Sequence, residues 1–292
     1  MGRRINLLRL VGVIALLPCF ACDDLTLPAQ QDGGSSGVTP TPDGGVVDST
    51  KIPPYVPKDA KIGQVTEALN STLVTWATVD TANKVNGFYW NLPLSAVSAL
   101  EGAKFDARVW MNVPAEVSRD TAITGLGYDY LAIGHVPNGV YNVAHWEFHV
   151  VFQDFNEVQN IDCSDSTLPP PPMVPQGWGV LPPPDNCFSA MGIHAINFAA
   201  PEFNGQRFSY TNLLVYYRGN GKLKDVGPRL TSFEPKATVQ NLKERKTFEI
   251  QFPTMPPGAI GREGMVPTKM AATYDSTNDV YIISVTGFQQ AS

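Results

Sequence analysis

The feature that most constrains this fold is a series of β-rich runs in which apolar and polar residues alternate between turns. The clearest run is His145-Trp146-Glu147-Phe148-His149. Side chains two apart in a strand share a face, so such runs suit sheets with one buried face. Nine such runs and two short helical segments predict a mainly β chain, folded as an antiparallel sandwich or barrel. The strands are expected at residues 71–80, 86–93, 104–114, 127–136, 140–152, 212–218, 248–252, 270–274 and 280–288, and the helices at 94–101 and 238–245.

The first 58 residues are typical of an export signal followed by a tether. Three arginines precede an apolar run at residues 10–17, which is too short to cross a bilayer, since a spanning helix needs about 20 residues. Cys22 follows Ala21 just after this run, and the arrangement resembles the acylated cleavage site of bacterial lipoproteins. The alternative is an ordinary cleaved signal with incidental cysteines. We therefore expect a lipoprotein signal peptide at 1–21, a flexible Gly/Pro/Ser/Asp tether at 22–58 and a β domain at 59–292.

This organisation predicts a protein of the bacterial cell envelope, anchored by lipid to a membrane and facing the periplasm or the surface. The net charge of the whole chain is -6, and loss of the signal would leave 18 basic and 27 acidic residues, a net charge near -9. Such a balance excludes nucleic acid as a partner, because phosphate binding needs basic density. The acidic surface and the strand edges permit a homo-oligomer without specifying one.

Cys163 and Cys187 are the two cysteines of the expected domain. In an oxidising compartment an even pair predicts a disulfide, here closing a proline-rich surface loop and contributing roughly 3 kcal/mol by the chain-entropy model. A metal site built on these cysteines is disfavoured, because neither has another Cys or a His at ligand spacing.

The histidines are the candidate functional residues. His145, Glu147 and His149 would line one face of a strand, with Trp146 and Phe148 on the opposite, core face. Neighbours in this row are about 6.8 Å apart and can hold one metal ion, whereas the two histidines are about 13 Å apart and would scarcely share one. Three interpretations stay open: a metal or catalytic site, a solvent-exposed face, and a buried hydrogen-bonded network.

The register of the hairpin decides which residues accompany this row. Asn138-Gly139 predicts a two-residue turn, which would pair Pro137 with Val140. The same register directs His135 away from the row. The expected cross-strand pairs are His145 with Ala132, Glu147 with Tyr130 and His149 with Tyr128, so that both tyrosines would join the polar face.

Five ordered motifs add a family resemblance. They are GHVPNGVY (134–141), HWEFHVVF (145–152), MGIH (191–194), PEFNGQRF (201–208) and FEP (233–235). Together they resemble an uncharacterised family of exported bacterial proteins whose shared domain has no known activity and carries HFDFHFY-, MGxHW- and PEFxGQPF-like motifs. The sequence departs from this pattern at Glu147, where the family has Asp, and at Ala195, where it has an aromatic residue. The resemblance implies that one constellation contains His135, His145, Glu147, His149, His194 and Glu202.

These observations support three hypotheses. The first is a metal-binding envelope protein with Zn or Cu held by His145, His149, His194, Glu147 and Glu202, and with His135 as a secondary candidate. The second is a structural or self-assembling binding module without metal. The third is a metal-dependent hydrolase in which a spare carboxylate acts as base. No catalytic residue, substrate or small-molecule ligand is assigned, because the sequence contains no nucleophile elbow, HExxH motif or phosphate loop.

Overall fold

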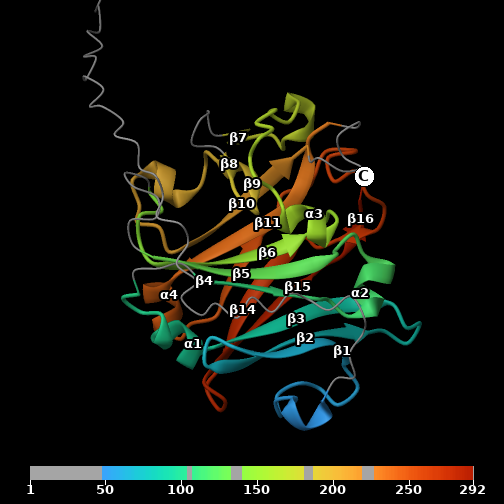
Figure 1. Cartoon of the computed structure of the whole chain (residues 1–292), viewed down its shortest axis with the longest axis vertical. Helices are drawn as coiled ribbons and strands as arrows, with labels where there is room; N and C mark the ends of the chain where they lie inside the picture. Colours follow the sequence, from blue (N-terminus) through green and yellow to red (C-terminus); the bar gives the residue numbers. More distant parts are fainter. Residues whose placement is uncertain (1–47, 104–106, 133–139, 181–186, 219–226, 292) are drawn as a thin grey trace, which may run out of the picture. The chain divides into compact units, whose positions relative to one another are not determined.

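The computed structural model describes residues 48–103, 107–132, 140–180, 187–218 and 227–291, all of which belong to one compact unit, residues 37–292. Two antiparallel sheets dominate this unit (Figure 1). The six-stranded sheet has the order β1 (Lys61–Ala68), β2 (Ser71–Val79), β3 (Val85–Pro93), β15 (Val280–Thr286), β14 (Lys269–Asp275) and β12 (Phe248–Gln251).

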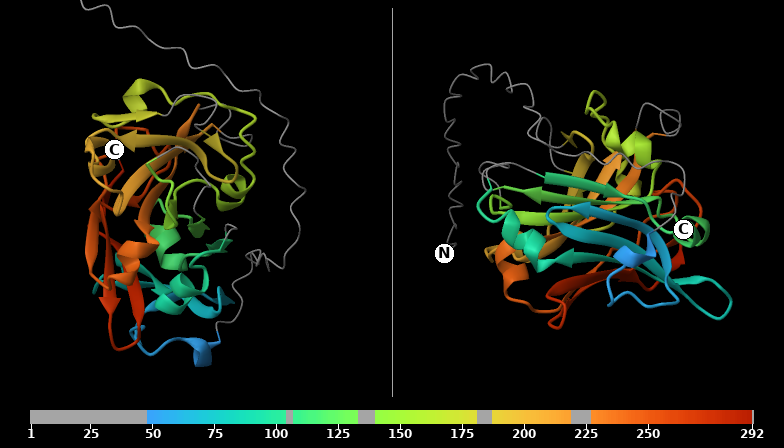
Figure 2. Two further views of the ribbon diagram at one scale, coloured as in Figure 1. Left: turned by 90° about the vertical axis from the view of Figure 1, so that its left-hand side faces the viewer. Right: turned by 60° about the horizontal axis from the view of Figure 1, so that its bottom comes forward.

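The second sheet has eight strands and carries the residues of interest. Its order is β4 (Ala107–Met111), β5 (Gly125–Leu131), β6 (His145–Val151), β11 (Arg229–Thr238), β10 (Tyr210–Tyr217), β9 (Gly192–Asn197) and β7 (Trp178–Val180), with β8 (Cys187–Phe188) also paired to β9. A small third sheet joins β13 (Met265–Val266) to β16 (Gln289–Gln290). Figure 2 shows the sheets from two further directions.

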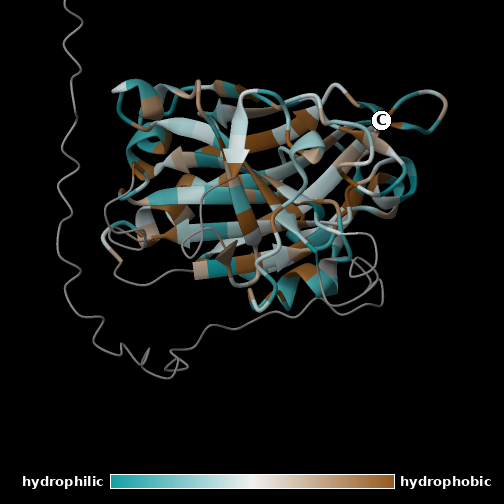
Figure 3. Cartoon of the chain, turned by 90° about the horizontal axis from the view of Figure 1, so that it is seen from above, coloured by the Kyte–Doolittle hydropathy of each residue, from teal (hydrophilic) through white to brown (hydrophobic). Residues whose placement is uncertain are grey.

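The two large sheets pack face to face through large apolar side chains. Trp90 on β3 contacts Phe148 on β6 with ring centroids 6.3 Å apart, and the Tyr128 hydroxyl on β5 donates to the Asn91 carbonyl of β3 at 2.9 Å. Polar and apolar residues alternate along several strands, as the hydropathy colours of Figure 3 show. The predicted antiparallel sandwich is therefore confirmed. The alternative of a closed barrel is wrong, because each large sheet has two unpaired edges over the described residues.

The helices are short and lie between strands. The two expected helical segments form α1 (Leu94–Ala99) and α4 (Val239–Lys243), while α2 (Ala115–Asp120) and α3 (Phe155–Gln159) were not predicted. Three single 3-10 turns, η1 (Ser49–Lys51), η2 (Pro171–Met173) and η3 (Pro201–Asn204), complete the helical elements of the described chain. None of the helices in the described ranges is long and apolar enough to span a membrane.

Residues 48–58, which the sequence analysis assigned to the tether, pack against the six-stranded sheet. Val56 is buried beside Val74 and Trp76, and the Tyr55 hydroxyl accepts a hydrogen bond from the Asn91 side chain at 2.8 Å. These few apolar residues suffice to order a proline-rich segment because they cover the outer face of β2. The signal peptide, Cys22 and the remainder of the tether lie outside the described residues.

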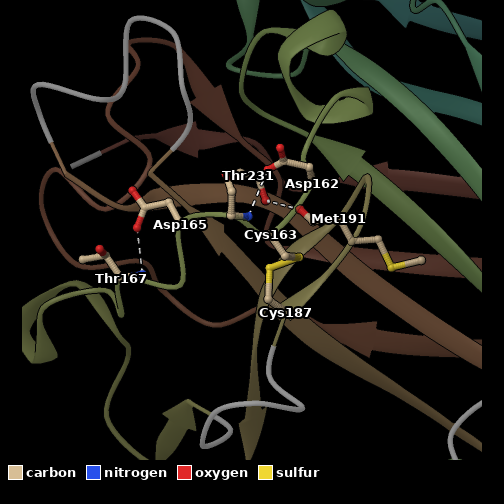
Figure 4. Close-up of a disulfide and its surroundings, with 8 residues drawn as sticks. Asp162, Cys163, Asp165, Thr167, Cys187, Met191 and Thr231 are labelled. Carbon is tan, nitrogen blue, oxygen red and sulfur yellow. Dashed lines mark hydrogen bonds between the residues drawn. A yellow bond between two sulfur atoms is a disulfide. The ribbon is translucent and has the colours of Figure 1, made fainter. Parts of the chain in front are cut away.

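The predicted disulfide between Cys163 and Cys187 is confirmed, with the two Cα atoms 5.8 Å apart. It ties β8 to the turn that follows α3 (Figure 4). The loop that it closes contains η2 and β7, so the proline-rich segment is only partly irregular.

Candidate metal centre

The candidate site begins with the alternating run on β6. Trp146 and Phe148 point into the core between the sheets, and the intervening His145, Glu147 and His149 occupy the opposite face, as the alternation predicted. Each of these three polar residues is only 1% exposed. The interpretation of this row as a solvent-exposed face is therefore wrong.

The pairing of β6 with the neighbouring strand β5 is shifted by one residue from the expected register. Glu147 pairs with Asp129, not with Tyr130, and His149 pairs with Gly127, not with Tyr128. Because side chains alternate, this shift exchanges the two faces of β5. Tyr128 and Tyr130 enter the core, and Asp129 joins the polar row in their place.

The physical reason for the shift is burial. Two large tyrosines gain more by packing in the core than beside carboxylates, and the register follows them. The turn expected at Asn138-Gly139 lies outside the described residues, and so does His135. In the described chain, β6 begins only at His145, so residues 140–144 form part of a connection longer than the two-residue turn implied.

Glu234 and Lys236 on β11 complete the row, and the sequence analysis missed both. Lys236 pairs directly with Glu147 across the sheet. The alternation of Ser232, Glu234 and Lys236 with apolar residues could have indicated a strand with one polar face. Pro235 argues against a central strand, because proline cannot donate a hydrogen bond to a β-ladder. The strand β11 is nevertheless central in its sheet.

Ionic contacts connect these side chains across four strands. Arg108 on β4 makes a two-point contact with Asp129 at 2.7 and 2.6 Å. The Lys236 ammonium contacts Glu147 Oε1, and it lies 2.8 Å from Glu234 Oε1. Four adjacent strands therefore carry Arg108, Asp129, Glu147 and Lys236 side by side, and the last three are almost completely buried.

His149 occupies the centre of the network. Its Nε2 lies 3.2 Å from Asp129 Oδ2 and 3.6 Å from Glu147 Oε2, and its Nδ1 lies 3.5 Å from Glu234 Oε2. Among the described residues, Asp129, Glu147 and His149 are the group of three ligand types that can share one ion, each offering an atom within 4.8 Å of the others.

Two of the three separations suit ligands of one metal ion. Metal–ligand bonds of about 2.1 Å at tetrahedral angles place ligand atoms about 3.4 Å apart, and the His149 Nε2 atom lies 3.2 Å from Asp129 Oδ2 and 3.6 Å from Glu147 Oε2. All three ligand atoms lie within 4.8 Å of one another. Glu147 Oε2 is buried, and the nitrogen next to it is His149 Nε2 at 3.6 Å, so this oxygen faces His149. Arg108 would orient Asp129 in the manner of an outer-sphere partner.

The other predicted ligands lie around this group. His194 reaches it through Glu234, with Nε2 2.9 Å from Glu234 Oε2. His145 sits between the Val143 carbonyl at 2.6 Å and Glu147 Oε1 at 3.2 Å. Glu202 accepts a hydrogen bond from the Tyr141 hydroxyl at 2.9 Å and is not part of the three-residue group.

Burial and charge act in opposite directions on the ionisation of the network. Burial disfavours an imidazolium at His149, but the charge of Asp129 and hydrogen bonds to Asp129 and Glu147 raise its pKa to about 10. Burial likewise works against charge on the glutamates, yet Lys236 holds the pKa of Glu147 well below its usual range. Despite burial and the repulsion of Glu147, the charges of His194 and Lys236 lower the pKa of Glu234 to about 2.

Aromatic rings cover the polar row. Trp110 lies over His149 with centroids 5.8 Å apart, in space left by Gly127, where a Cβ atom would collide with the indole. Phe188 contacts His194, and Phe208 contacts His145. The remaining cover is Tyr141, whose ring centroid is 5.2 Å from the Lys236 ammonium. A ligand would therefore enter only after one of these rings moves.

Comparisons of the chain with protein-family models, with curated proteins and with solved structures gave no match. The family resemblance carried by the five motifs stays a prediction. Inferences about function consequently rest on the geometry of the network.

Proposed function

We propose that this chain is a lipid-anchored protein of the bacterial cell envelope that binds one divalent transition-metal ion, Zn²⁺ or Cu²⁺, through Asp129, Glu147 and His149. The observation that carries the proposal is the buried group of three ligand atoms within 4.8 Å of one another, in which His149 Nε2 lies 3.2 Å from Asp129 Oδ2 and 3.6 Å from Glu147 Oε2. One imidazole and two carboxylates suit zinc, and three protein ligands leave a fourth position open.

The protein environment supports this assignment in two ways. Each ligand has a charged neighbour: Arg108 contacts Asp129, Lys236 contacts Glu147, and Glu234 lies 3.5 Å from His149 Nδ1. The site is also closed to water by Trp110, which would slow loss of a bound ion. Binding must displace the proton of His149, so affinity should weaken as the pH falls.

The test is metal analysis of residues 24–292, exported to the periplasm without a histidine tag and measured by mass spectrometry. We expect about one Zn or Cu per chain in the parent and loss of metal in His149→Ala and Asp129→Asn. Glu249→Gln, which removes an exposed carboxylate paired to Lys269, is the matched control and should retain the metal. A parent that stays empty after dialysis against Zn²⁺ and Cu²⁺ would refute the proposal.

A second function, a structural module that binds no metal, is favoured by Lys236 and Arg108. Their two positive charges already neutralise two of the three buried carboxylates, and a proton on His149 neutralises the third. Under this alternative the parent stays metal-free, and His149→Ala lowers the free energy of unfolding without changing metal content. A hydrolase has no comparable observation in its favour.

A further inference from the structure

The disulfide lies directly beside one edge of the polar network. Cys187 is the first residue of the two-residue strand β8, and Phe188 is the second. Both Cys163 and Cys187 are half-buried, so a soluble reductant can approach the bond from the surface. Figure 4 shows the bond at the turn where the two segments meet.

Phe188 is the residue that covers the β9 end of the network. Its ring meets His194 edge to face, with centroids 4.9 Å apart, and His194 is 3% exposed. The Nδ1 atom of this histidine is buried without a hydrogen-bond partner, although its Nε2 contacts Glu234. Glu234 in turn lies 3.5 Å from His149 Nδ1, so a chain of contacts leads from Phe188 through His194 and Glu234 to the candidate metal centre.

In the described part of the chain, β8 is a short strand with a short pairing. It pairs with β9 at Cys187–Ile193 and Phe188–Gly192. Cys163 of the bridge and Ala190, three residues after Cys187, have φ angles of 61° and 58°, a left-handed conformation that non-glycine residues rarely adopt. One backbone hydrogen bond, from Ala190 N–H to the Ile161 carbonyl at 2.6 Å, also joins the two turns. A turn hydrogen bond from Met191 N–H to the Phe188 carbonyl at 3.1 Å closes the hairpin between β8 and β9. Among the described residues, the disulfide is the covalent restraint that ties this short hairpin arm to the segment after α3.

We propose that the Cys163–Cys187 disulfide is a redox-controlled latch, which keeps Phe188 over His194 and closes the buried network until a dithiol reductant opens it. The thiolate of the reductant attacks one sulfur and forms a mixed disulfide, and the other cysteine leaves as a thiol. The second thiol of the reductant then displaces the remaining cysteine, so that the protein gains two thiols and the reductant becomes a disulfide. This latch does not depend on a metal being bound; where one is bound, opening would speed its exchange.

The test uses diethylpyrocarbonate, which acylates accessible imidazole nitrogens, with each histidine read out by peptide mass spectrometry. We compare the oxidised parent, the same protein reduced natively with dithiothreitol, the Cys163→Ser, Cys187→Ser variant, and Phe188→Ala with its disulfide intact. In each of the last three, acylation of His194 should accelerate by at least about tenfold, as expected for a local opening. His145, which lies under Phe208, is the internal control and should not change.

Phe198→Ala is the matched control variant. The Phe198 ring lies directly after β9 and is 60% exposed, so its removal should leave His194 protected. An unreactive His194 in the reduced protein and in Phe188→Ala would overturn the proposal. So would reactivity in Phe188→Ala alone, because the disulfide would then not hold the cover. An equal rise at His145 and His194 would show general unfolding and would also refute a local latch. The readout needs no metal, so it is independent of the metal assay.

Discussion

Lys236→Met tests whether the buried network is an electrostatic unit. The substitution keeps an unbranched side chain but removes the ammonium that contacts Glu147 and Glu234, which are 1% and 0% exposed. At the 2.8 Å separation from Glu234, Coulomb's law with an effective dielectric constant of about 20 gives about 6 kcal/mol of attraction. Desolvation of the ammonium offsets part of this, and removing one partner of a buried pair typically costs about 3–5 kcal/mol. We expect a loss of that size in the free energy of unfolding.

Urea denaturation of the metal-free protein at pH 7 measures this loss. The matched control is Lys243→Met, whose ammonium lies 2.7 Å from Glu101 but in solvent, with the two side chains 42% and 51% exposed. Exposed pairs of this kind contribute about 1 kcal/mol or less. A loss in Lys236→Met no larger than in Lys243→Met would refute the electrostatic unit. Under the proposed function the same variant should also bind Zn²⁺ more tightly, because the cation that competes for Glu147 is gone.

Three further predictions follow from the same residues. The raised pKa of His149 stabilises the metal-free fold fully below about pH 6.5, and this contribution is lost as the pH rises towards about 10. Urea denaturation should therefore give a free energy of unfolding roughly 3 kcal/mol lower at pH 9 than at pH 6. Equal free energies at the two pH values would contradict a protonated His149. Cu²⁺ should quench the fluorescence of Trp110, 5.8 Å from His149, and Trp110→Phe should remove most of that quenching. If Cys22 carries the lipid, Cys22→Ala should move the protein from the detergent phase to the aqueous phase in detergent partitioning; retention in the detergent phase would disprove that anchor.

Local alternation was sufficient to predict the orientation of β6. Trp146 and Phe148 are apolar, so the intervening His145, Glu147 and His149 had to share the other face, and they do. The same local information gave most strands and two helices, because alternation and turn residues depend on neighbours in the chain. It also placed two of the three candidate ligands, Glu147 and His149.

The remaining site residues depend on contacts between distant strands. Lys236 reaches Glu147 across 89 positions of sequence, and no local pattern specifies that pairing. Asp129 was missed because a register error of one residue exchanges faces, and the turn that sets the register could not be derived from Asn138-Gly139 alone. The depth of burial could not be predicted either, because the rings that cover the row come from distant segments: β4, β8, residues 201–208 and Tyr141 before β6.

The charge balance of the network explains why a metal site and a structural network use the same residues. Asp129, Glu147 and Glu234 supply three negative charges, and Arg108 and Lys236 supply two positive ones. The remaining negative charge lies next to His149, where a proton or a divalent ion can neutralise it. Proton and metal would therefore compete for one imidazole nitrogen, and the occupant would depend on pH and on the supply of metal. Lys236 affects this competition between proton and metal, because it contacts one oxygen of Glu147 and leaves the other oxygen facing His149.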